Sequence, residues 1–304
     1  MEQKSITALV SAFSRAYHSM HNTEKVFDDC LARKILTDEE YKLIETNMSK
    51  GISFFNPSFE GTKEEALRWV VDNQLSPSPL GRAAFTERLL ENAVSIGAKQ
   101  YLIFAAGYDT FAYRQRDWAS KIEIFEIDHP LTGEDKQKRI RELVKHKPEN
   151  LHYVSADFTK ENWQRNLLDC KEFNQSKISF CSLLGISYYL PKNVFAEIIK
   201  TISRIVPEGS SIVIDYPDEY TYSDKAGERA KKQVIMVGSA NEKMLASYSY
   251  TELEKLLGDS SFLIYEHLTP NEITEQYFTK YNQANPEHQI TAFDNVNYCL
   301  AVKK

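Results

Sequence analysis

Three acidic side chains follow three successive strand-like runs, and together they could bind the polar groups of one nucleoside. Asp109 lies in the turn after the run YLIFAA, Asp128 ends the run IEIFEID, and Asp157 ends the run LHYVSAD. A carboxylate after the second strand can accept hydrogen bonds from both ribose hydroxyls, and one after the third can accept from the amino group of adenine. Since the carboxyl ends of parallel strands meet at one edge of an open α/β sheet, we expect the three side chains to surround a single pocket.

The turn after the first run indicates which nucleoside fits better. It reads Ala105-Ala106-Gly107, with one glycine where a dinucleotide-binding fingerprint has three. Gly107 permits a close backbone approach or a positive φ, although a plain strand-to-helix turn would use it equally well. A pyrophosphate needs several free N–H groups at a helix N-terminus. This turn is poorer in them, so a phosphate-free nucleoside is favoured over NAD.

Helix capping is the alternative role for Asp128 and Asp157. Aspartate is a favoured N-cap residue, so Asp128 could cap a helix beginning near Leu131, and Asp157 could cap one beginning at Thr159. Taken together with the glycine turn, the position of Asp128 favours ribose binding over capping.

The chain up to about Gln74 is expected to be helical. It has no strand-like alternation, and the spacing of its apolar residues predicts helices over residues 6–17, 26–36 and 38–48. We assign residues 1–75 to an N-terminal helical cap. After it, Pro77 and Pro79 predict extended backbone, followed by a helix over residues 81–97 that ends at Gly97.

From Gln100 onward, seven short runs rich in β-branched and aromatic residues alternate with helix-length stretches. The runs occupy residues 101–106, 122–128, 151–157, 178–185, 211–217, 262–268 and 297–303. This pattern predicts an α/β fold, with a doubly wound, seven-stranded, mostly parallel sheet covered on both faces. The last two runs lack a clear amphipathic crossover helix between them, so one of them is expected to run antiparallel. Residues 76–304 are assigned to this domain, with a polar lid insertion after the fifth strand at about 216–250.

Composition excludes several classes of function. The 304 residues carry a formal net charge of −6, which argues against a nucleic-acid partner. No apolar run approaches the roughly 18 to 20 residues of a membrane span, and the first residues do not resemble a signal peptide, so we expect a soluble, cytoplasmic protein without a membrane partner. The four cysteines are scattered without a metal-ligand pattern, and no metal site is expected.

Two compound motifs resemble the paired signatures of the leucine carboxyl methyltransferase family. These are YLIFAAGYDTFAYR and, at the proper spacing, IFEIDHPLTGEDK. The resemblance implies a Rossmann-like class I methyltransferase that uses S-adenosyl-L-methionine. It implies that Gly107 and its neighbours touch the methionine moiety, Asp128 the ribose and Asp157 with Phe158 the adenine, while Arg82 pairs with the cofactor carboxylate. The full set of expected cofactor-binding residues is Arg82, Ala105, Ala106, Gly107, Asp109, Asp128, His129, Asp157, Phe158 and Leu184.

Two positions depart from the family pattern. The first turn of the family usually has two glycines, and here the earlier one is Ala105, which is expected to fit only with a negative φ. The fourth strand of the family commonly ends with Glu-Gly near the cofactor amino group, whereas this chain has Leu184-Gly185. Asp109 could substitute for that glutamate. This departure favours the bacterial small-molecule branch over protein methylation.

The expected activity is methyl transfer to a carboxylate or hydroxyl of a small molecule. A protein C-terminal carboxyl methyltransferase and a non-catalytic S-adenosylmethionine-binding protein are the alternatives. Methyl transfer from a sulfonium mainly requires alignment and exclusion of water, so no catalytic residue is assigned, and His129 is expected to pack or to face the adenine edge. Tyr113, Arg114, Tyr188 and Tyr189 are candidates to line the acceptor pocket. The acceptor and the oligomeric state are left open.

Overall fold

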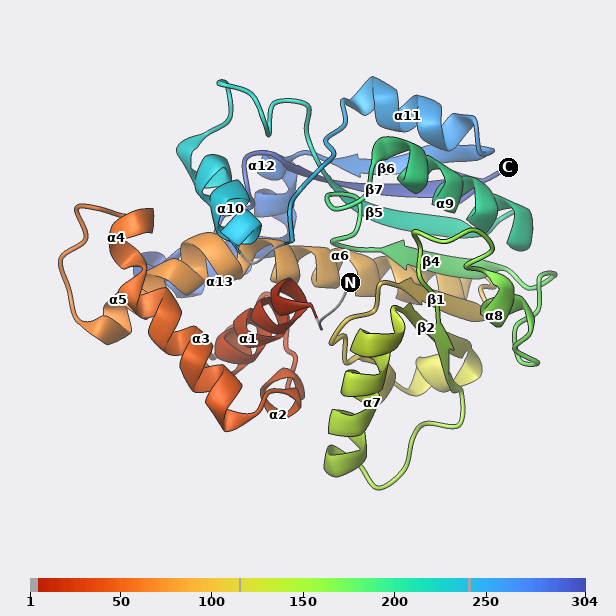
Figure 1. The fold of residues 1–304 in the computed structure, drawn as a ribbon, viewed down its shortest axis with the longest axis horizontal. Coiled ribbons are helices and arrows are strands. Elements are labelled where there is room, and N and C mark those ends of the chain that lie inside the picture. Colours follow the sequence, from red (N-terminus) through yellow and green to blue (C-terminus); the bar gives the residue numbers. More distant parts are fainter. Residues whose placement is uncertain (1–4, 115, 240–241) are drawn as a thin grey trace.

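The core of the protein is one seven-stranded sheet with the strand order β3-β2-β1-β4-β5-β7-β6 (Figure 1). The computed structural model describes residues 5–114, 116–239 and 242–304. All seven predicted strands are present, and β7 runs antiparallel to both of its neighbours while the other pairings in the β3-β2-β1-β4-β5 series are parallel. The strands are β1 Gln100–Phe104, β2 Glu123–Asp128, β3 Leu151–Ser155, β4 Ser179–Leu183, β5 Ser211–Pro217, β6 Phe262–Leu268 and β7 Val296–Lys303.

Both faces of the sheet are covered, as the continuous apolar strands predict. Along β1, Tyr101 and Ile103 pack on one face, whereas Leu102 and Phe104 pack on the other. Helix α6 (Pro77–Ser95) covers the first face. Helices α9 (Lys192–Ile205) and α11 (Tyr250–Gly258) cover the second. Helices α7 Pro130–Leu143 and α8 Arg165–Leu168 follow β2 and β3, and the short 3-10 turns η2 Phe111–Tyr113 and η3 Asp117–Lys121 follow β1.

A set of N-terminal helices packs around a separate apolar core. The helices are α1 Ile6–His21, α2 Ala32–Ile35, α3 Asp38–Lys50, α4 Ile52–Phe55 and α5 Lys63–Val70, followed by the π-helical turn η1 Val71–Leu75. The helix predicted over residues 26–36 is wrong except for α2, because Asp29 is buried in a polar cluster described below instead of facing solvent from a helix. Residues 1–4 of the expected cap and 240–241 of the expected insertion lie outside the described residues.

The extended backbone predicted at Pro77 and Pro79 is also wrong. Helix α6 already begins at Pro77, and Ser76 before it has helical backbone angles. A proline in the first helical turn loses no hydrogen bond, because the N–H groups of that turn have no intrahelical partner. The predicted end of the helix is confirmed, since Gly97 has a φ of +125° directly after the last turn.

The polar segment after β5 contains helix α10 (Glu228–Ser239), which packs near α4. The connection between β6 and β7 is more helical than expected: α12 Pro270–Ile273, η4 Thr274–Phe278 and α13 Thr279–Ala284 follow one another, and η5 Pro286–His288 comes after them. No helix within the described residues is both long enough and apolar enough to cross a membrane.

Candidate functional site

A cavity of about 690 Å³ lies at the carboxyl ends of β1, β2, β3 and β4. Side chains from α1, α6 and α10 form much of its remaining wall. All ten residues expected to bind the cofactor line this one cavity: Arg82, Ala105, Ala106, Gly107, Asp109, Asp128, His129, Asp157, Phe158 and Leu184. The three acids Asp109, Asp128 and Asp157 therefore surround a single hollow.

The turn after β1 has two residues in the left-handed region. Ala105 and Gly107 each have a φ of +52°. The expectation that Ala105 keeps a negative φ is therefore wrong, and the chain accepts a backbone strain of about 1–2 kcal/mol at this alanine. At Gly107 a side chain meets a second obstacle, because an added Cβ atom would lie 3.3 Å from the Cβ atom of Ala8 in α1. The turn thus brings its backbone close to the N-terminal helix.

Asp128 links the ends of β1 and β2. One of its carboxylate oxygens accepts a hydrogen bond from the Gly107 N–H, and the other accepts from the His129 N–H at 2.6 Å. Burial raises the pKa of Asp128, and these two donors act against that rise. The alternative role as a helix cap is wrong, because His129 is the N-cap of α7 and its ring accepts from the Leu131 N–H. Each carboxylate oxygen retains a second lone pair, so the group can still accept hydrogen bonds from a ligand diol.

Asp157 and Phe158 form the wall after β3. Asp157 accepts from the N–H of Thr159 at 3.0 Å and from its hydroxyl at 2.6 Å, and the bond from the hydroxyl is the main cause of the lowered pKa of Asp157. Both bonds go to one oxygen, Oδ1. The helix expected from Thr159 is absent, and turns lead instead to α8. The ring of Phe158 packs against Trp163 with a centroid separation of 5.2 Å, which presents an aromatic edge beside Asp157.

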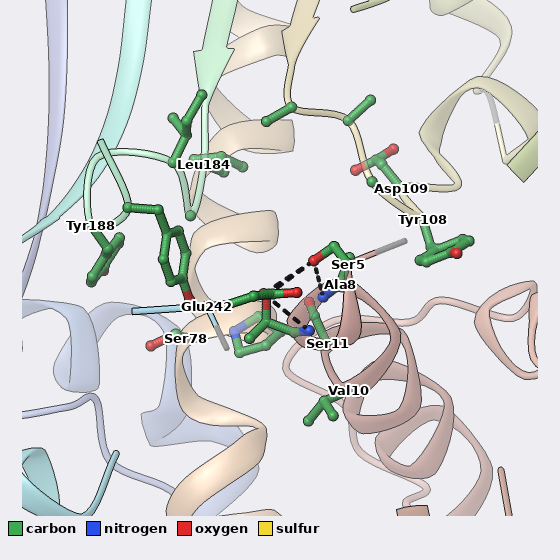
Figure 2. Close-up of a pocket in the computed structure, with 18 of the residues that line it drawn as sticks. Ser5, Ala8, Val10, Ser11, Ser78, Tyr108, Asp109, Leu184, Tyr188 and Glu242 are labelled. Atoms are coloured by element: carbon green, nitrogen blue, oxygen red, sulfur yellow. Dashed lines mark hydrogen bonds between the residues drawn. The ribbon is translucent and has the colours of Figure 1, made fainter. Parts of the chain in front are cut away.

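Asp109 and Leu184 lie on the cavity wall near the first turn (Figure 2). Asp109 uses Oδ1 to accept from the Phe111 N–H at 2.7 Å, which holds the 3-10 turn that follows. Its other oxygen makes no hydrogen bond within the described residues. Leu184 presents an apolar side chain to the same cavity, so any carboxylate in this part of the wall comes from other positions.

Arg82 has an acidic partner that the sequence analysis missed. Its Nη1 lies 3.1 Å from Oδ2 of Asp215, a fully buried residue of β5. Asp215 also accepts from the Gly185 N–H at 2.6 Å and from the Tyr188 hydroxyl at 3.2 Å. A Cβ atom at position 185 would lie 2.5 Å from Arg82 Nη1, so only glycine lets the guanidinium approach this backbone. An acid within the apolar run SIVIDYP is the signal that could have indicated this buried pair.

A buried ionic cluster joins the first helices to the cavity. Asp29 accepts from Arg15 Nε at 2.9 Å and from the Thr110 hydroxyl at 2.6 Å, and Arg114 Nε lies 3.3 Å away. Arg114 also bonds Glu87 of α6 at 2.7 Å. Burial would raise the pKa of Asp29, but the two guanidinium groups hold it below its usual value. Thr110 and Arg114, which belong to the motif YLIFAAGYDTFAYR, therefore help to hold α1 against the turn after β1.

The four residues expected near the acceptor separate into two groups. Arg114, Tyr188 and Tyr189 line the cavity. Tyr113 does not lie among its lining residues, and its hydroxyl bonds that of Tyr153 on the edge strand β3. The expectation for Tyr113 is therefore wrong, because the 3-10 turn η2 directs its side chain toward β3.

Glu242 of the insertion also lines the cavity and was not anticipated. Its carboxylate accepts from the Ile6 N–H at 2.7 Å and the Thr7 N–H at 3.3 Å, and from the hydroxyls of Ser5 and Thr7 (Figure 2). A carboxylate at a helix N-terminus is favoured by the unpaired N–H groups and by the helix dipole. This contact ties the insertion to the start of α1 across the cavity.

A small group of possible metal ligands lies elsewhere. Donor atoms of His152, Cys170 and Glu172 lie within 4.8 Å of one another, and none of these residues lines the cavity. Glu123 accepts from the His152 ring at 2.7 Å, and the Cys170 thiol donates to Glu172 at 3.3 Å. These groups already satisfy one another, and the expectation of no metal site stays a prediction.

The arrangement suits a cationic nucleoside. Asp109, Asp128, Asp157 and Glu242 give the wall four carboxylates, and the arginines that reach it have acidic partners. The first turn and the side chains after β2 and β3 line this cavity together.

Comparison with known proteins is consistent with this geometry. The family described as leucine carboxyl methyltransferase matches residues 8–203. YktD of Bacillus subtilis, which is named as a candidate S-adenosyl-L-methionine-dependent methyltransferase, is 40% identical, and the alignment covers 99% of each chain. Among solved structures, a DUF574 family protein from Streptomyces avermitilis has a TM-score of 0.61 at 12% identity and covers 97% of each chain. A candidate methyltransferase from Thermobifida fusca has a TM-score of 0.57 at 15% identity, with 99% of this chain and 96% of that one covered. The two structures show likeness of fold.

Proposed function

This chain belongs to the leucine carboxyl methyltransferase family and is an S-adenosylmethionine-dependent methyltransferase, and from that premise we propose that it methylates an oxygen atom of a small-molecule acceptor. The observation that carries the proposal is the roof over the cavity. The start of α1 and the insertion residue Glu242 are hydrogen-bonded to each other at the cavity wall, so an acceptor would lie in a hollow between helices and not on a flat surface. Such a chamber favours a small molecule over the C-terminus of a folded protein.

The cofactor would be held by the residues at the carboxyl edge of the sheet. In this proposal Asp128 accepts from the ribose hydroxyls, Asp157 and Phe158 contact the adenine, and the backbone around Gly107 borders the methionine moiety. Arg82 keeps guanidinium donors beyond the one that bonds Asp215, and its side chain is 20% exposed, so it can reach a carboxylate in the cavity. Asp109, through its second oxygen, is available to an ammonium group in place of the missing glutamate.

When bound, S-adenosylmethionine would supply an electrophilic methyl group: an O–C bond to the acceptor would form in line as the C–S bond breaks, and S-adenosylhomocysteine would leave as a neutral thioether. The residues of this chain contribute alignment and a water-poor surrounding. The roof contact between Glu242 and α1 limits access of water, while Leu184 and Tyr188 add apolar and aromatic surface. A carboxylate acceptor is already ionised at neutral pH and needs no base, whereas a hydroxyl acceptor must lose a proton.

Calorimetry tests the cofactor assignment. We expect S-adenosylmethionine and S-adenosylhomocysteine to bind and NAD to produce no heat. Asp128→Ala removes a carboxylate that accepts hydrogen bonds from the backbone and, in this proposal, from the ribose. We therefore expect S-adenosylhomocysteine to bind this variant at least ~30-fold more weakly, which corresponds to about 2 kcal/mol. The exposed Asp117→Ala is the matched control and should bind like the parent protein. Unchanged affinity in Asp128→Ala would contradict the assignment, provided that thermal unfolding shows a folded variant.

Product formation tests the acceptor class. The protein is incubated with S-adenosylmethionine and either a panel of small phenols and carboxylic acids or a peptide ending in a free leucine carboxylate, and S-adenosylhomocysteine release is measured. Release with members of the small-molecule panel supports the proposal. Release with the peptide alone would favour protein carboxyl methylation instead.

A further inference from the structure

Two glutamine side chains on the cavity wall have a carbonyl oxygen with no hydrogen-bond donor among the described residues. Gln74 and Gln233 both line the cavity, and the Oε1 atom of each is buried and accepts no hydrogen bond within the described residues. Gln74 is only 4% exposed. A buried carbonyl without a donor destabilises a folded protein, so native structures rarely keep one unless a ligand or water completes it. The two glutamines come from separate segments, η1 and α10.

Gln74 is separated from Arg82 along one wall of the chamber. It precedes Arg82 by eight residues on the nearly continuous helical stretch formed by η1 and α6, and at 1.5 Å per residue this separation is roughly 12 Å. Leu75, Ser78 and Pro79 line the cavity along the same stretch. The cavity wall also includes apolar side chains from α1, α3 and α10, which are Val10, Met48, Met236 and Val237. Gln74 therefore borders a chamber that extends from the carboxyl ends of the strands to η1 and has a mainly apolar lining.

The charges of the chamber do not favour an anionic guest. Arg15 and Arg114 are paired with Asp29, and Arg82 is paired with Asp215. Lys243 is the one further lysine or arginine among the lining residues that the structure describes, and it is exposed. The cavity wall also carries the carboxylates of Asp109, Asp128, Asp157 and Glu242. The local potential therefore disfavours an acceptor that adds a carboxylate to that of the cofactor.

We propose, on the basis of the proposed function, that the acceptor is an uncharged, mainly apolar and elongated molecule whose polar end, remote from the methylated atom, is bound by the carboxamide of Gln74. A carboxamide offers both a donor and an acceptor, so it recognises a neutral hydroxyl or amide group and not a formal charge. Gln74 is then a specificity-determining residue: its hydrogen bond is made only when the acceptor is bound, and the free protein carries the cost of the unpaired group.

The test compares the parent protein with Gln74→Met, an apolar replacement of similar length. Gln283→Met on the exposed surface of α13 is the matched control. Three probes sharing one skeleton are titrated into the protein saturated with S-adenosylhomocysteine: para-phenylphenol, para,para′-biphenol, and the analogue in which a carboxylate replaces the second hydroxyl. Thermal unfolding of the ligand-free proteins is recorded in parallel.

Five results are expected. Biphenol binds the parent protein more tightly than phenylphenol, and the carboxylate analogue binds at least tenfold more weakly than biphenol. Gln74→Met weakens biphenol binding by about three- to tenfold, the effect of one hydrogen bond, while phenylphenol affinity changes by less than about twofold because that probe has no distal polar group to lose. Ligand-free Gln74→Met melts about 1–3 °C higher than the parent, since an unpaired buried group is removed, and Gln283→Met does not.

Each contrary result overturns the inference. An unchanged or lower melting temperature in Gln74→Met would mean that the carboxamide is satisfied in the free protein. The inference would be refuted if Gln74→Met lost affinity equally for biphenol and phenylphenol. It would also be refuted if the parent protein bound the carboxylate analogue more tightly than biphenol. If S-adenosylhomocysteine binds and none of the three probes does, the inference fails while the cofactor assignment stands. If S-adenosylhomocysteine itself does not bind, the proposed function fails first.

Discussion

The two ends of the cavity are built in different ways. The end that faces the sheet consists of turns that follow β1, β2 and β3, and Asp128 ties two of these turns together through backbone hydrogen bonds. The opposite end consists of α1, η1 and α10, segments that are far apart in the chain and meet through side chains such as Glu242. The register of the strands therefore positions the end formed by the turns after β1, β2 and β3. The end formed by α1, η1 and α10 depends on packing between segments that are distant in sequence.

The ionic cluster around Asp29 joins the two ends, and removing it should have the largest effect. Asp29→Ala leaves the buried guanidinium groups of Arg15 and Arg114 without their shared partner, so we expect a loss of about 3–5 kcal/mol in the free energy of unfolding, measured with urea. The adjacent Asp28→Ala is the control. Its side chain is 52% exposed in a surface pair with Lys25, so the change should be below ~1 kcal/mol. Similar losses in both variants would show that the cluster does not join the ends.

The turn after β1 gives a second and smaller contrast. Gly107→Ala should destabilise the protein by about 1–3 kcal/mol, because an alanine there is strained at positive φ and meets Ala8 of α1. Ala105→Gly is expected to have little effect. It relieves a similar strain, and this gain offsets the greater freedom of glycine in the unfolded chain, so the free energy of unfolding should stay within ~1 kcal/mol of the parent value. Urea unfolding and S-adenosylhomocysteine calorimetry check both. Equal losses in the two variants would contradict the assigned strain.

Glu242→Gln tests the roof alone and should have the smallest effect. The glutamine keeps an acceptor oxygen but loses the negative charge at the start of α1, which we expect to cost about 0.3–1 kcal/mol. The KM for an acceptor should rise by a few-fold, while the affinity for S-adenosylhomocysteine stays the same. Glu219→Gln, exposed on the same insertion, provides the control. A matching loss of cofactor affinity would show that Glu242 serves the sheet end as well.

Much of the sheet end could be predicted because its signals are local. Apolar strands, a glycine turn and an acid after each strand are read over a few residues, and strand pairing then brings their ends to one edge. The error at this end concerns backbone detail, because Ala105 adopts a positive φ where a negative one is expected. The sequence analysis favoured ribose binding over capping for Asp128, and the N-cap of α7 is His129.

The opposite end could not be predicted in the same way. The helix expected over residues 26–36 failed because Asp29 is paired with arginines from α1 and from the turn after β1, partners that no local pattern shows. Glu242 and Gln74 were missed for the same reason, since each acquires its role from residues distant in sequence. Asp215 of β5 was also missed, because its partner Arg82 is equally distant in sequence.

By itself, the sequence determined the seven strands, the mostly parallel sheet with one reversed strand, and the three acids that share one hollow. These follow from hydrophobic periodicity and from the geometry that every parallel sheet has in common. Only the tertiary structure decided which charges neutralise one another and which polar groups stay unpaired in the chamber, as Arg82 with Asp215 and the carboxamide of Gln74 illustrate. The physical reason is that an ion pair or an unmet hydrogen bond depends on distances of a few ångströms between segments that the chain brings together only when it has folded.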